Sequence, residues 1–113
     1  ALAARYAEGL RGVGDLTLPV AHPEARPAWH LYVVRTPRRD ALKDHLAARG
    51  VQAGLHYPVA AHQQPAHAER FRGVSLPRAE AWAASVLTLP LSHEHDDAEI
   101  DRVIGAVREF YGA

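Results

Sequence analysis

Two histidines and a tyrosine around one proline are the residues of this chain whose types and spacing best suit chemistry. His56 and Tyr57 directly precede Pro58, and His62 follows four residues later. Imidazole and phenol groups exchange protons and form hydrogen bonds with phosphate or hydroxyl groups. Gly54 frees the backbone and Pro58 disfavours helix at Tyr57, so we expect a shaped loop of the kind that carries binding groups. The residue types alone equally allow a rigid turn around a buried tyrosine.

Other reactive side chains are less well arranged. The chain has eight histidines, and His93 and His95 lie next to Asp96 and Asp97. Zinc sites need three or four ligands at set spacings, and the sequence contains no H-x-x-x-H or H-E-x-x-H pattern. We therefore expect no metal site, with the two aspartates capping a helix, and a histidine-based metal protein remains the minor alternative. No serine lies in a Gly-x-Ser-x-Gly motif, and no glycine-rich phosphate loop occurs.

Composition narrows the class of protein. The chain has 113 residues, no cysteine, and 13 basic against 13 acidic residues. A length of this order fits a single domain. The balanced charge predicts no excess of basic residues that would attract nucleic acid or an anionic membrane. No apolar run reaches the roughly 20 residues that a transmembrane helix requires. We expect a cytoplasmic protein whose partners include neither nucleic acid nor membrane.

Apolar periodicity and turn residues predict the elements that position the loop. Thr36 and Pro37 resemble a helix start, and Asp96 with Glu99 resembles a capping box. Strand, helix and strand following one another closely indicate a small α/β unit. The expected helices cover residues 1–11, 37–49, 64–70, 77–86 and 96–110, and the expected strands cover 29–35, 51–56 and 87–90.

Four stretches together resemble a known family. They are Trp29-His-Leu-Tyr-Val-Val-Arg35, then Arg39-Asp-Ala-Leu-Lys-Asp-His-Leu-Ala-Ala-Arg-Gly50, then Gly54-Leu-His-Tyr-Pro58 with His62-Gln-Gln-Pro65, and Leu87-Thr-Leu-Pro-Leu91. In this order and spacing they resemble the C-terminal part of the DegT/DnrJ/EryC1/StrS family, pyridoxal-phosphate-dependent aminotransferases that act mostly on nucleotide-linked keto-sugars. The sequence departs from the family pattern at Ala60 and His67.

The resemblance implies a fold and a set of partners. The fold is α/β (α+β): a small, mostly antiparallel three-stranded sheet packed against helices, as in the C-terminal domain of a fold-type-I aminotransferase. Residues 1–113 would form that single small domain, and the large N-terminal domain that binds pyridoxal phosphate would be its partner. A homodimer, a nucleotide-sugar substrate and glutamate or glutamine as amino donor are also implied. The lack of methionine and the helical pattern at residue 1 favour a fragment as well.

The resemblance also assigns site residues. His56 and Tyr57 would face the sugar nucleotide or the cofactor, and His62 would line or support their loop. No catalytic residue is assigned, because the coenzyme requires a Schiff-base lysine and Lys43 is the only lysine. Lys43 lies on the shoulder of a scaffold helix, without an evident acidic partner for the pyridine nitrogen. We therefore expect the isolated chain to be inactive, and the alternative is a free-standing binding or interaction module without catalysis.

Overall fold

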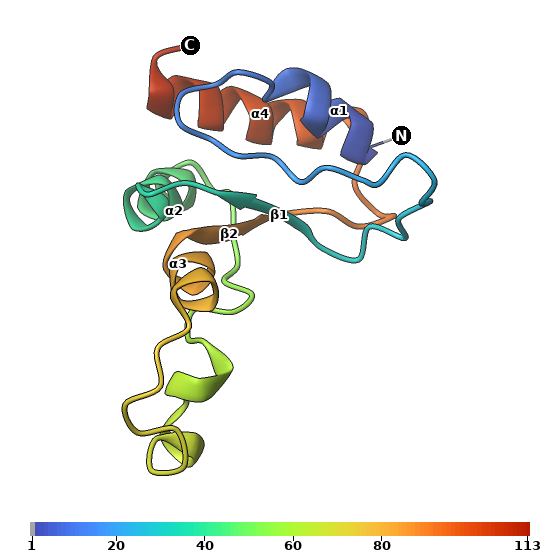
Figure 1. The fold of residues 1–113 in the computed structure, drawn as a ribbon. Coiled ribbons are helices and arrows are strands. Elements are labelled where there is room, and N and C mark those ends of the chain that lie inside the picture. The colour runs from blue at the N-terminus through green and yellow to red at the C-terminus, as the bar shows by residue number, and fades with distance from the viewer. Residues whose placement is uncertain (1) are drawn as a thin grey trace.

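A computed structural model describes residues 2–113. Within this range the elements are α1 (Leu2–Gly9), β1 (Tyr32–Arg35), α2 (Arg39–Ala48), the single 3-10 turns η1 (Ala61–Gln63) and η2 (Pro65–His67), α3 (Pro77–Ser85), β2 (Val86–Leu89) and α4 (Asp97–Tyr111). Helices α1 and α4 lie together on one side of the strands, and α3 leads down into a projecting segment (Figure 1). Among residues 2–113, no helix combines the length and the apolar character needed to cross a membrane.

The two strands form one antiparallel pair. Tyr32 lies opposite Leu89, and Arg35 lies opposite Val86. All four residues of β2 are buried, whereas burial alternates along β1. The strand predicted over 29–35 is therefore confirmed only in its second half, and the strand predicted near 87–90 is confirmed with a one-residue shift.

The prediction of a third strand over residues 51–56 is wrong within the described chain. Only Gly54 pairs, exchanging backbone hydrogen bonds of 2.8 and 2.9 Å with Thr88. On one side of this bridge, the next hydrogen-bonded position would pair Gln52 with Pro90, which has no amide to donate. On the other side it would pair His56 with Val86, whose amide is already bonded to the Trp82 carbonyl at the end of α3. The ladder therefore has no room to extend, and the sheet has two strands rather than three.

The core lies between the strand pair and the helices α1, α2 and α4. It consists of large apolar side chains with almost no exposure, supplied by every one of these elements: Tyr6, Leu10, Tyr32, Val34, Leu42, Leu46, Leu87, Leu89, Ile100 and Val107. The Tyr6 hydroxyl donates a 2.7 Å hydrogen bond to the Pro90 carbonyl. Helix α1 is thereby fixed to the end of β2, next to the segment that leads toward α4.

The predicted helix starts have different outcomes. The capping box of α4 is confirmed: the Asp96 carboxylate accepts from the Glu99 amide at 2.8 Å, and the Glu99 carboxylate accepts from the Asp96 amide at 3.0 Å. Helix α2 begins later than predicted, at Arg39. The Thr36 hydroxyl accepts from the Arg38 amide at 3.0 Å, so it closes a turn before the helix instead of capping its first residue.

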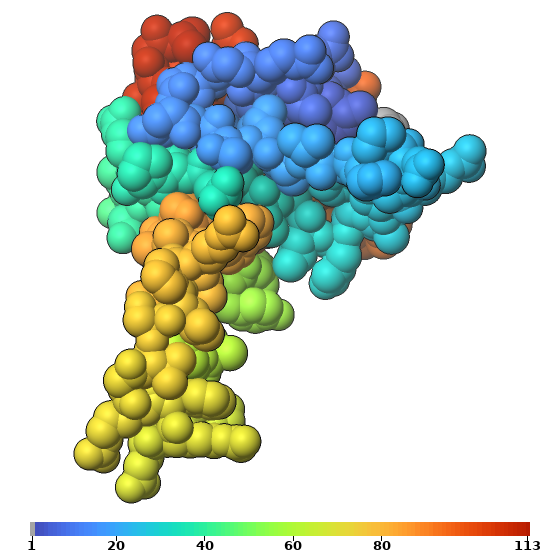
Figure 2. All heavy atoms as spheres, viewed as in Figure 1, coloured from blue at the N-terminus to red at the C-terminus, as the bar shows by residue number. Residues whose placement is uncertain are grey.

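Residues 57–76 form an arm that projects from the body of the domain (Figure 2). The radius of gyration is 15.5 Å, above the roughly 13 Å expected for a compact domain of this length. The helix predicted over 64–70 is wrong: η1 and η2 are separate turns with extended backbone at Gln64 between them. Because Gln64 precedes Pro65, the helical conformation is disfavoured at that residue.

Candidate functional site

His56 is held at the start of the loop by contacts on two sides. Its Nδ1 lies 2.9 Å from the Thr88 hydroxyl, and its ring makes an edge contact with Tyr57 at a centroid distance of 5.5 Å. A Cβ atom at Gly54 would lie 2.9 Å from His56 Cε1, closer than real Cβ contacts. Gly54 is thus required here by the close approach of the imidazole, and any larger residue would displace the ring.

An open cavity of about 570 Å³ lies next to His56. Its walls come from the residues just before β1, from α2 and the segment after it, and from the end of β2 with the residues that follow. The lining residues are His30, Leu31, Lys43, Ala47, Gln52, Ala53, Gly54, His56, Thr88, Leu89, Pro90 and Leu91. The structure therefore places the predicted site residue His56 and the scaffold residue Lys43 around one cavity, which the sequence reasoning did not anticipate.

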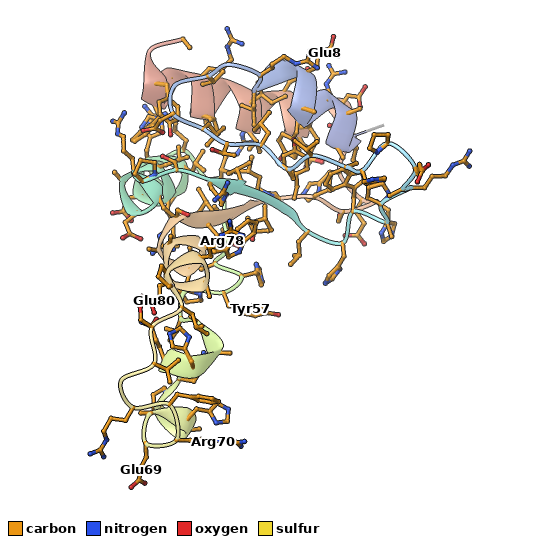
Figure 3. All side chains as sticks on the ribbon, in the orientation of Figure 1. Glu8, Tyr57, Glu69, Arg70, Arg78 and Glu80 are labelled. Carbon is orange, nitrogen blue, oxygen red and sulfur yellow. The ribbon has the colours of Figure 1, made fainter. Side chains whose placement is uncertain are left out.

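Tyr57 occupies a different position from His56. It is 71% exposed, lies outside the cavity lining, and its side chain points away from the protein at the base of the arm (Figure 3). The alternative of a rigid turn around a buried tyrosine is therefore wrong. Exposure on this scale leaves the phenol open to solvent.

His62 is buried within the arm, on the side that faces α3, with 7% of its surface exposed. Its Nε2 lies 2.9 Å from a carboxylate oxygen of Glu80 on α3, and the same oxygen accepts a 2.7 Å hydrogen bond from the Leu76 amide. Glu80 therefore joins the beginning and the end of the arm. These contacts place His62 in a supporting position, apart from the cavity that His56 lines.

The Glu80 contacts predict an acid-sensitive arm. The Leu76 amide and then His62 hold the pKa of Glu80 below its ordinary value of 4.5. A carboxylate with a depressed pKa in the folded state stabilises the fold above its unfolded pKa, and this contribution disappears as pH falls through the folded value. We expect Glu80→Gln to lower the free energy of unfolding at pH 7. Between pH 7 and about pH 4, the free energy of unfolding should then fall less in Glu80→Gln than in wild type.

Urea unfolding followed by circular dichroism at pH 7 and near pH 4 measures this effect. Glu69→Gln is the matched control, because Glu69 is an exposed carboxylate at the far end of the same arm (Figure 3). If the free energy of unfolding depends on pH equally in wild type, Glu80→Gln and Glu69→Gln, Glu80 does not join the beginning and the end of the arm.

Sequence reasoning missed Thr88 and Glu80 as supports of the two histidines, and it treated Lys43 only as part of a scaffold. Thr88 carried a usable signal, because it is the one polar residue in an otherwise apolar strand, and the structure shows it to be buried. Glu80 carried a weaker one, as an acidic residue in the first turn of α3. Nothing local in sequence links Lys43 to His56.

The histidines near α4 take part in a turn. His95 Nδ1 accepts a 2.9 Å hydrogen bond from the Ser92 amide. Of the two aspartates expected to cap the helix, Asp96 does so, whereas Asp97 forms a 3.2 Å ion pair with Arg5 of α1. Within the described range 2–113, no group of three or more potential metal ligands comes together.

An antiparallel strand pair packed against α1, α2 and α4, with a cavity at its edge, defines a small α/β domain. The sequence profile of the DegT/DnrJ/EryC1/StrS aminotransferase family matches residues 1–108, and the chain belongs to that family. It is 50% identical over 111 residues to the dTDP-3-amino-3,4,6-trideoxy-alpha-D-glucose transaminase of Streptomyces venezuelae, covering 97% of this chain and 29% of the relative. The dTDP-3-amino-3,6-dideoxy-alpha-D-galactopyranose transaminase of Aneurinibacillus thermoaerophilus is 33% identical over 109 residues, covering 96% of this chain and 30% of the relative.

Solved structures show the same fold. Streptomyces venezuelae DesV, crystallised with a ketimine intermediate, superposes with a TM-score of 0.95 at 47% identity, covering 99% of this chain and 30% of that one. A family aminotransferase from Brucella abortus gives a TM-score of 0.89 at 31% identity, with the same coverage. The chain thus spans about 30% of the length of the relatives that it matches.

Proposed function

We propose that residues 1–113 are the C-terminal small domain of a pyridoxal-phosphate-dependent aminotransferase acting on a nucleotide-linked keto-sugar, and that they supply one wall of its active site. Membership of the family and relatives named as dTDP-sugar transaminases support the reaction class. The observation that carries the proposal within this chain is the imidazole of His56, fixed by Thr88 at the edge of an open cavity of about 570 Å³.

His56 and Tyr57 have separate tasks in this proposal. Because Thr88 occupies Nδ1 of His56, the other ring nitrogen remains for a hydrogen bond with a ligand. Tyr57 is exposed at the base of the arm, where its phenol is free to meet the substrate or the N-terminal domain. His62 holds the loop through Glu80 and touches no ligand.

The residues present do not make up a site for pyridoxal phosphate. Bound in an aminotransferase, this group serves as an electron sink, and it requires a lysine with an acidic or arginine partner for its ring nitrogen. The cavity lining contains Lys43, the only lysine, but no aspartate, glutamate or arginine. This supports a cofactor held by an N-terminal domain. From membership of the family we further propose a cytoplasmic homodimeric enzyme with glutamate or glutamine as amino donor, and no activity in the isolated chain.

The test is steady-state transamination by the whole enzyme with a dTDP-linked keto-sugar. We expect His56→Ala to lower kcat/KM by roughly 10-fold to 100-fold, the effect of losing a hydrogen bond to a charged group. Tyr57→Phe should lower it by roughly threefold to tenfold, because only a neutral hydroxyl is lost. His93→Ala, an exposed histidine outside this cavity, is the matched control and should leave kcat/KM unchanged.

Wild-type kinetics in both His56→Ala and Tyr57→Phe, with the fold intact by circular dichroism, would remove this loop from the active site. Activity of the whole enzyme toward amino-acid keto acids alone would refute the keto-sugar assignment.

A further inference from the structure

A groove that shares no lining residue with the cavity at His56 lies between α1 and residues 18–21, which run beside that helix (Figure 1). Its volume of about 380 Å³ falls within the range of small-molecule sites. Ala4, Ala7 and Arg11 line its helical side at spacings of three and four residues, so they share one face of α1 and of the turn after it. The two alanines leave room along the helix, and we call this hollow the α1 groove.

The walls of the α1 groove that face the helix are apolar. Val20 is 93% exposed, and Trp29 is half-buried with its indole 5.4 Å from the Tyr32 ring, centroid to centroid. Trp29 has a φ of +32°, which is uncommon for a bulky residue, and strained backbone of this kind is concentrated at functional sites such as ligand clamps. An aromatic ring is the ligand group that stacks on an indole and covers exposed apolar side chains.

The α1 groove has one charged group and no acidic one. Arg11 is the only charged residue of its lining, and of the ion pairs formed within residues 2–113 none involves Arg11. The Tyr32 hydroxyl is buried without a hydrogen-bond partner in the described residues, and burial raises the pKa of Tyr32 to about 12. The phenol is therefore neutral at pH 7, so no lining residue brings a negative charge that would repel an anion at Arg11.

We propose that the α1 groove binds an aromatic monocarboxylate, with the carboxylate on Arg11 and the ring system on Trp29. A guanidinium binds a carboxylate through two parallel hydrogen bonds. Ala4 and Trp29 also line a neighbouring hollow, which places the indole at the N-terminal end of α1, whereas Arg11 follows its C-terminal end. At the helical rise, Ala4 to Arg11 extend over about 10 Å, a length that suits two fused rings with one acid group. This site does not depend on the function proposed above.

Isothermal titration of the whole enzyme with 2-naphthoate, and separately with the neutral 2-naphthamide, tests the site. We expect Arg11→Gln to raise the Kd of 2-naphthoate about tenfold, because a charge-assisted contact is lost, and to leave the Kd of 2-naphthamide unchanged. Ala7→Leu fills the groove and should raise the Kd of both compounds about tenfold or more. Arg78→Gln is the matched control, because it removes one positive charge from α3, outside the groove, and should leave both Kd values unchanged (Figure 3).

Titration of 2-naphthoate in the presence of saturating dTDP separates this groove from the cavity at His56. We expect an unchanged Kd, and competition between the two compounds would overturn the site. No binding of 2-naphthoate to wild type would also overturn it, as when an N-terminal domain or a second copy of the chain covers the groove. Equal Kd values of 2-naphthoate in wild type and Arg11→Gln, with equal unfolding midpoints, would refute the carboxylate contact and with it the proposal.

Discussion

A Gly14→Ala variant should be destabilised by about 2 to 5 kcal/mol. Gly14 has a φ of +54°, and a Cβ atom there would overlap the ring of Tyr111, lying 2.5 Å from Cε1 and closer still to Cδ1. A side chain in left-handed backbone costs about 1 to 2 kcal/mol, and forcing atoms into a packed site costs about 1 to 3 kcal/mol more. The combined cost is a large part of the stability of a domain of this size.

Displacing Tyr111 also disturbs a polar network that joins three parts of the chain. The hydroxyls of Tyr111 and Thr36 each donate to the Asp15 carboxylate at 2.7 Å. The hydrogen bond from Thr36, and after it the one from Tyr111, holds the pKa of Asp15 below its ordinary value. Burial raises the pKa of Tyr111 to about 12. The network links the segment after α1, the end of β1 and the end of α4.

Gly12→Ala is the matched control, because Gly12 has a φ of +70° and open space where a Cβ would lie. It should show only the backbone cost of about 1 to 2 kcal/mol. Urea unfolding of both variants, monitored by circular dichroism, gives the difference. Equal losses at Gly12 and Gly14 would show that Tyr111 does not pack against Gly14.

The second large effect is complete loss of transamination when residues 1–113 are isolated from the rest of the enzyme. Lys43 is the only lysine, and the lining of its cavity offers no carboxylate for the pyridine nitrogen. Added pyridoxal phosphate and glutamate should therefore give no amino sugar from a dTDP-linked keto-sugar above the rate without protein. The whole enzyme is the positive control. Turnover by residues 1–113 alone would contradict the proposal that another domain holds the cofactor.

The elements with strong local signals could be predicted from the sequence. The capping box and apolar stripe located α4, and Pro77 marked the start of α3. The third strand failed because its hydrogen bonds depend on distant partners: Pro90 has no amide, the Val86 amide is bonded within α3, and only Thr88 between them pairs with Gly54. The periodicity of a single segment contains no information on such competition.

The site could be predicted only as a loop. The spacing of His56, Tyr57 and Pro58 marked the segment, but not the separation of its side chains into a cavity residue and an exposed one. The supports from Thr88 and Glu80 lie 32 and 18 residues away from the histidines that they contact. Contacts over such distances are set by tertiary packing, so an isolated sequence does not specify them.

Borohydride reduction of the whole enzyme loaded with pyridoxal phosphate, followed by peptide mass mapping, tests the central claim most directly. Reduction fixes the coenzyme to whichever lysine forms the Schiff base. We predict a stoichiometric pyridoxyl group on a lysine outside residues 1–113, with the Lys43 peptide unmodified. A pyridoxyl group on Lys43 would contradict the account, because the cofactor would then be anchored in this domain.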